Sequence, residues 1–213
     1  MTPGRIAPGR RLPLILGTFL GLAASLQASP VDNAQALFRQ KKYAEARAIL
    51  EPLVASEPSN SAAAYFLGMT YLRQGGPKGL DSARLWIGKA VKLAPSQEGY
   101  LADYAGVCFL MADRDSSFSL ALEGRDAMIR AVAEKPDDLD ACDGLMKFYA
   151  TAPWPLGSAD KALELAAQIT RFDPKRGPAA YRAIEAIFEK NGRTLKAKSA
   201  ADAAQSLAPG HPQ

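Results

Sequence analysis

The sequence holds few of the residues from which catalytic and metal sites are built. Its single histidine, His211, lies in a Pro-Gly-His-Pro stretch near the C-terminal end. A zinc site needs several converging ligands, and a serine triad needs a histidine held in a folded core. There is also no His-Glu-x-x-His motif and no glycine-rich phosphate loop after a strand. We therefore expect a protein that is not an enzyme and has neither a metal nor a cofactor, the one catalytic alternative being a site of carboxylates alone.

The N-terminal apolar run, Leu12 to Leu26, is short for a membrane-spanning helix, which needs about 20 residues. Three arginines and no acid precede it, and small residues follow it up to Ala28. This order is typical of a secretory signal peptide, so we predict that residues 1–28 are removed after Ala28. We therefore expect a periplasmic or secreted protein without stable membrane insertion. The alternative is a protein anchored through an uncleaved N-terminal segment.

Without residues 1–28, the chain has almost equal numbers of basic and acidic residues. The full chain has 26 basic and 22 acidic residues, and residues 1–28 hold three of the basic ones and none of the acidic ones. The remainder therefore carries 23 basic and 22 acidic residues. Nucleic-acid-binding domains carry a strong basic patch. We expect no nucleic acid among the partners.

What the chain does have is a regular series of prolines, separated by 37, 41, 38 and 35 residues: Pro58, Pro95, Pro136, Pro174 and Pro209. Twelve residues before each proline comes a small residue, in order Ala46, Ala83, Gly124, Ala162 and Ala197. A small residue lets two helices approach closely, and proline ends a helix because it lacks an N–H and clashes with the preceding turn. A period in the thirties indicates stacked helix pairs.

The second of these units carries the most complete motif. Leu67-Gly68-x-x-Tyr71, followed by Ala83, Ile87 and Pro95, resembles the tetratricopeptide repeat, TPR. The resemblance extends from about Val31 to Pro209 and implies an all-α, right-handed α-solenoid of about five helix-turn-helix units. We place the solenoid at residues 29–209, with a flexible tail at 210–213. The expected units are residues 31–58, 59–95, 96–136, 137–174 and 175–209.

The two cysteines, Cys108 and Cys142, fall on the inner faces of first helices in neighbouring units. One lies late in its helix and the other early, an offset of about two turns. At 1.5 Å per residue this separates them by about 10 Å along the axis, too far for a disulfide. We predict two buried free thiols, although export would permit a disulfide.

The resemblance also implies that the first helices line a concave groove. Residues one position beyond the packing stripe are then expected to face it: Tyr65, Met69, Arg73, Phe109, Asp143, Lys147, Tyr181 and Glu185. Tyrosine and arginine are favoured at interaction surfaces because they combine large contact area with polar tips. The alternatives are that the tyrosines pack between repeats and that Asp143 and Lys147 form a solvated pair.

Compared with a 34-residue repeat, the units run long, and the extra residues are expected in loops between the helices of a unit, at Gly75–Asp81, Asp113–Phe118 and Thr151–Ala159. Such loops would stack into a ridge along one edge. Trp154, between two prolines, is its candidate partner-binding residue. The alternative is that Trp154 folds back over the helix ends.

The last helix, expected from Thr194 to Leu207, has no further unit to cover it. Polar residues interrupt its alanines at Lys196, Lys198, Asp202 and Gln205, so we expect it to cap the solenoid itself. The alternative is self-association through this end.

Together these features predict an exported, non-catalytic TPR scaffold that binds a protein or peptide in the cell envelope. The alternative is a small-ligand-binding accessory protein of a transport system, which a closed apolar pocket of several hundred Å³ would favour. The sequence names neither the partner nor the oligomeric state.

Overall fold

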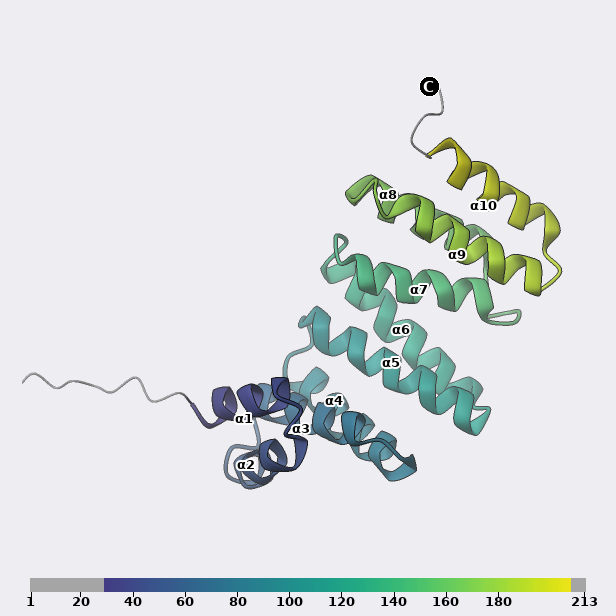
Figure 1. Cartoon of the computed structure of the whole chain (residues 1–213). Helices are drawn as coiled ribbons and strands as arrows, with labels where there is room; N and C mark the ends of the chain where they lie inside the picture. Colours follow the sequence, from purple (N-terminus) through teal and green to yellow (C-terminus); the bar gives the residue numbers. More distant parts are fainter. Residues whose placement is uncertain (1–28, 208–213) are drawn as a thin grey trace, which may run out of the picture.

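The computed structural model describes residues 29–207, in which ten α-helices form five successive hairpins stacked side by side (Figure 1). The first helices are α1 (Pro30–Arg39), α3 (Ser61–Gln74), α5 (Glu98–Asp115), α7 (Leu139–Thr151) and α9 (Gly177–Lys190). The second helices are α2 (Tyr43–Ser56), α4 (Pro77–Leu93), α6 (Phe118–Glu134), α8 (Ala159–Phe172) and α10 (Thr194–Ser206). Each hairpin packs on the next, so the described residues form an α-solenoid without strands, as predicted. The expected signal peptide and tail lie outside the described residues.

The repeated prolines set the ends of the second helices. Helices α2, α4, α6 and α8 each end two residues before a proline, and the intervening residue is Glu57, Ala94, Lys135 or Asp173. These four residues have φ between −123° and −141° and ψ between 73° and 95°. These conformations lie outside the helical region, as expected before proline, whose ring disfavours that region for its neighbour. The fifth proline, Pro209, lies outside the described residues.

The small residues of the repeat lie where the two helices of a hairpin cross. Ala46, Ala83 and Ala162 are fully buried. At Gly68 of α3, a Cβ atom would lie only 2.6 Å from the side chain of Ile87 and 2.9 Å from its backbone nitrogen. Glycine at this position of the Leu-Gly-x-x-Tyr motif therefore permits the close approach of α3 and α4.

The acidic run before α7 acts as a helix cap. The side chain of Asp138 accepts hydrogen bonds from the backbone N–H groups of Asp140 and Ala141, each at 3.1 Å. Carboxylates are favoured at this end because it presents unpaired N–H groups and the positive end of the helix dipole.

The prediction of a long loop is wrong at two of the three places, Gly75–Asp81 and Asp113–Phe118. Helix α4 begins at Pro77, which leaves only Gly75 and Gly76 between the helices, and α5 and α6 are separated only by Ser116 and Ser117. The extra residues lengthen α4, α5 and α6 to 17, 18 and 17 residues. Proline is compatible with the first turn of a helix, so the Gly-Gly-Pro sequence starts α4 rather than extending a loop. The seven residues between Thr151 and Ala159 are the one long loop among the described residues, and no continuous ridge forms.

Both cysteines are buried and free, as predicted. Burial raises the pKa of each thiol to about 11. Within residues 29–207, no helix is both long and apolar enough to cross a membrane.

Candidate functional site

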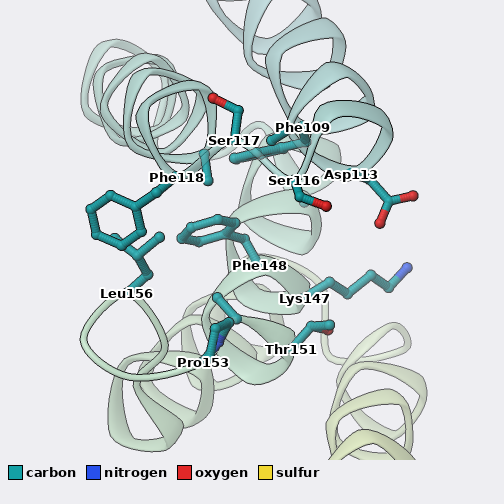
Figure 2. A pocket seen from close by; sticks show the side chains of 14 residues that line it. Phe109, Asp113, Ser116, Ser117, Phe118, Lys147, Phe148, Thr151, Pro153 and Leu156 are labelled. Carbon is teal, nitrogen blue, oxygen red and sulfur yellow. The ribbon is translucent and has the colours of Figure 1, made fainter.

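A cavity of about 610 Å³ opens between the C-terminal ends of α5 and α7 (Figure 2). Phe109 of α5 and Phe148 of α7 form its floor, with their rings stacked 4.7 Å apart at an interplanar angle of 17°. Phe118, the first residue of α6, lies at one side and is 54% exposed. The cavity is open to solvent, and its lining is mainly apolar.

The loop between α7 and α8 forms another wall. Pro153 and Leu156 line the cavity, and the backbone N–H groups of Leu156 and Gly157 both donate to the carbonyl of Pro153 at 2.9 Å. The N–H of Ser158 donates to the carbonyl of Tyr149 at the same distance. A Cβ atom at Gly157 would lie 1.9 Å from the carbonyl oxygen of Ala152, so this turn requires glycine. The wall is therefore fixed by the loop's own hydrogen bonds.

Polar groups gather at one side of the cavity, where Figure 2 shows Asp113 and Lys147. Lys147 donates to the carboxylate of Asp143 one helical turn earlier, at 2.6 Å. The exposed Asp113 makes no hydrogen bond or ion pair with any other part of residues 29–207. The unbalanced charge on this side is therefore that of one carboxylate.

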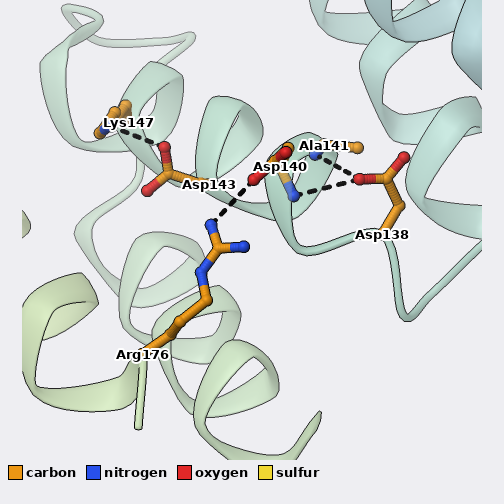
Figure 3. A network of polar contacts seen from close by, with 6 residues as sticks. All are labelled: Asp138, Asp140, Ala141, Asp143, Lys147 and Arg176. Atoms are coloured by element: carbon orange, nitrogen blue, oxygen red, sulfur yellow. Dashed lines mark hydrogen bonds and ion pairs between the residues drawn. The ribbon is translucent and has the colours of Figure 1, made fainter. Parts of the chain in front are cut away.

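A second cavity of about 280 Å³ lies between α7 and α9, and Lys147 lines both. Ala179 and Ala183 of α9 leave the space open. Its charged residues are largely paired (Figure 3): Lys147 with Asp143, and Arg176 with Asp140 at 2.9 Å. The two cavities follow one another along the first helices.

Comparison with known proteins bears on the fold. No protein-family model and no curated protein matches the sequence. Among solved structures, YrrB, described as a TPR protein with an unusual peptide-binding site, is 19% identical, with a TM-score of 0.66 over 85% of this chain and 86% of that one. A MamA structure is 20% identical, with a TM-score of 0.66 over 84% of this chain and 89% of that one. A MamA structure from Desulfovibrio magneticus RS-1 is 15% identical, with a TM-score of 0.63 over 84% of this chain and 92% of that one.

The chain has the fold of a TPR solenoid. At these identities the likeness concerns the fold alone. In the TPR solenoid, three of the expected groove residues come together: Phe109 and Lys147 line the first cavity, and Asp143 and Lys147 line the second. The stacking of Phe109 on Phe148 joins two successive first helices at this point.

Tyr65 has a different environment in the TPR solenoid. Its ring stacks on Tyr100 with 4.3 Å between centroids, and its hydroxyl donates to Asp103 at 2.5 Å. Burial, followed by the nearby Asp103 carboxylate, raises the pKa of Tyr65 well above its ordinary value. These contacts join α3 to α5, so Tyr65 packs between repeats.

The remaining groove residues are dispersed. Met69, expected in the groove, is only 5% exposed and packs against Ile87, because its side of α3 faces α4 and α5 rather than solvent. Arg73 is exposed on α3, and Tyr181 is half-buried beside the core. Glu185 lines a small cavity of about 180 Å³ between α9 and α10. None of these four residues lines the two cavities described above.

Trp154 is 88% exposed, so it does not fold back over the helix ends. Leu156 of the same loop is buried instead, at 5% exposed. The sequence pattern missed Phe148 and Leu156 because both lie outside the repeat stripes from which the groove was read. Phe118 was expected at the end of the loop Asp113–Phe118, and the ridge predicted from that loop was the one indication in the sequence that Phe118 belongs to a binding surface.

Another cavity of about 610 Å³ is lined by residues of α4, α5 and α6. Three of its polar side chains are bonded to acidic or basic partners: Arg84 to Glu123 at 2.6 Å, Tyr104 to Glu123, and Asp81 to Arg114 at 3.0 Å. The Arg84–Glu123 and Asp81–Arg114 pairs join neighbouring repeats. No group of three or more metal-ligating side chains occurs within the described part of the chain.

Proposed function

We propose that this protein is an exported, non-catalytic interaction scaffold that holds a segment of a protein or peptide partner along its third to fifth repeats. The observation that carries the proposal is the open, mainly apolar cavity between α5 and α7, continued by the smaller cavity between α7 and α9. Exposed apolar surface of this kind is favourable only when a partner covers it. The peptide-binding site named for YrrB, a protein of the same fold, agrees with a peptide partner.

A small-ligand-binding protein is the second candidate, because about 610 Å³ is within the range of small-molecule sites. Such sites bury most of their ligand, whereas this cavity is open along one side. The openness favours a partner that extends beyond the cavity, as a polypeptide does.

Site-specific photocrosslinking tests the scaffold. A photoreactive residue at Lys147 is expected to give a discrete protein adduct in the native cell envelope, and one at Trp154 tests the neighbouring loop. The matched control is Leu85 of α4, which is 66% exposed and lines neither of these two cavities. Adducts of equal yield at Lys147 and Leu85 would contradict a specific groove. Protein without adducts that carries a co-purified small molecule would support the ligand-binding candidate.

Export is tested separately with the full-length chain. We expect fractionation to recover the protein in the periplasm or the medium, with an intact mass that lacks residues 1–28. A full-length mass in the membrane fraction would favour the anchored form. Retention of the full-length protein in the cytoplasm would contradict export and leave the groove proposal standing.

A further inference from the structure

We infer that the cavity between α5 and α7 selects a partner segment in which a large apolar side chain adjoins a lysine or arginine. The apolar side chain lies over Phe109 and Phe148, and the basic group pairs with Asp113. This inference rests on the proposed function and names the class of segment that the scaffold binds.

The first step is the shape of the apolar part. Phe109 and Phe148 present a stacked aromatic floor, and Phe118 and Leu156 stand at one side. The volume of about 610 Å³ exceeds that of any single side chain, so it accommodates a phenylalanine or leucine together with adjoining backbone. Aromatic floors favour flat or branched apolar groups, which gain contact area without a buried polar atom.

The second step is the charge at the opposite side. Asp113 lines the cavity and is unpaired within residues 29–207, whereas Lys147 is neutralised by Asp143. The neighbouring Arg114 does not neutralise Asp113, because it pairs with Asp81 at 3.0 Å and with Asp115 at 2.7 Å. A basic group therefore complements this side and an acidic group is repelled by it.

The third step is the continuation of the site. Lys147 also lines the cavity between α7 and α9, where Ala179 and Ala183 leave room for an extended backbone. A segment anchored over Phe148 can therefore continue along the first helices. A small solute would leave the second cavity unfilled, which is why a polypeptide is the occupant that we propose.

The test begins with a phage-displayed library of random twelve-residue peptides, selected on the intact protein. We expect enrichment of Phe or Leu next to Lys or Arg. The enriched peptide is then synthesised with a fluorescent label, and its affinity is measured by anisotropy. Asp113→Lys should weaken binding about three- to tenfold, because an attractive charge becomes a repulsive one. Phe118→Ser should weaken it about tenfold through lost apolar contact.

The control is Asp202→Lys, which makes the same charge change at an exposed position of α10, away from the cavity. It should leave the affinity unchanged. Thermal unfolding of all variants should stay close to that of the wild type, because Asp113 and Phe118 are exposed.

Three results of the peptide experiments would overturn the inference. They are enrichment of acidic peptides, affinity that is indifferent to Asp113→Lys and Phe118→Ser, and failure of the library to yield any binder. If a photoreactive residue at Lys147 still gives a protein adduct in such a case, the proposed scaffold function is retained and only the proposed specificity of this cavity is rejected. A dimer in solution that dissociates on Phe118→Ser would instead assign the cavity to a second copy of the chain, which also overturns the inference.

Discussion

At the scale of single residues, Tyr65 and Asp103 form a polar pair that joins α3 to α5 on the first-helix side of the solenoid. Burial raises the pKa of Asp103, and the hydrogen bond from Tyr65 only partly offsets that rise. The folded protein therefore binds the Asp103 proton more tightly than the unfolded chain does. The contribution of this group to folding stability must then decrease as the pH rises from about 4 through the raised folded pKa.

We predict from this that Asp103→Asn has a higher unfolding temperature than the wild type at pH 7. The amide oxygen still accepts from Tyr65, and the buried charge is removed. The difference should shrink as the pH falls toward 3, where the wild-type carboxyl is protonated in both states. Thermal melts across this range provide the measurement, with the exposed Asp202→Asn as control. A lower unfolding temperature at pH 7 would show that the charge of Asp103 stabilises the fold, and a difference that does not vary with pH would show that the ionisation of Asp103 is not its cause.

Removal of the donor should act in the opposite direction. In Tyr65→Phe the Asp103 carboxylate loses its hydrogen bond while it stays partly buried. We expect the free energy of unfolding at pH 7 to fall by about 1–3 kcal/mol, measured by urea denaturation. An unchanged midpoint would indicate that water replaces the hydroxyl without cost.

The two cysteines make a separate prediction. Both thiols are buried, and their pKa values of about 11 keep them protonated near neutral pH. Iodoacetamide reacts with thiolates, so at pH 8 we expect no labelling of the folded protein and two labelled residues per chain in guanidinium chloride. Fewer than two in denaturant would reveal a disulfide, and rapid labelling of the native protein would reveal an exposed thiol.

At the scale of helices, substitutions at two glycines distinguish the effect of intrinsic helix propensity from the effect of packing between helices. Gly68 in α3 and Gly106 in α5 both lie inside first helices, where alanine is favoured by about 0.5–1 kcal/mol. A Cβ atom at Gly106 meets nothing within 4 Å, whereas one at Gly68 would meet Ile87 at 2.6 Å. We therefore predict opposite signs in urea denaturation: Gly106→Ala stabilises by that amount, and Gly68→Ala destabilises by about 1–3 kcal/mol. Equal effects of the two substitutions would contradict the helix crossing at Gly68.

The same scale shows why the sequence predicted the helix pairs better than the site. Proline and small residues act through local geometry, so Pro95 and Ala83 fix where α4 ends and where it crosses α3 without reference to the rest of the molecule. The extra residues of a long unit have no such local rule. They can extend a helix, as at Asp113–Asp115, or a loop, as at Ala152–Ser158. The cavity depends on the separation of α5 and α7, which no repeat position specifies.

At the scale of the whole molecule, the core is a series of linked clusters. One joins α1, α2 and α3, a second joins α3, α4 and α5, and the largest extends from α4 to α10. Each hairpin is therefore stabilised by its neighbours as well as by the packing of its own two helices, as in other stacked repeats. Within residues 29–207, helices in the middle pack against hairpins on both sides, and the terminal ones pack on one side.

The C-terminal helix should consequently be the first to open. The buried residues of α10 are three alanines, Ala197, Ala200 and Ala204, and Leu195 is largely exposed. An exposed ion pair between Lys196 and Asp160 at 2.5 Å adds little, because such pairs contribute at most about 1 kcal/mol. We predict that backbone amides of α10 exchange with solvent faster than those of α5, whose buried residues include Leu101, Val107 and Met111. Hydrogen exchange measured by mass spectrometry tests this, and equal protection of α10 and α5 would mean that the solenoid opens as one cooperative unit.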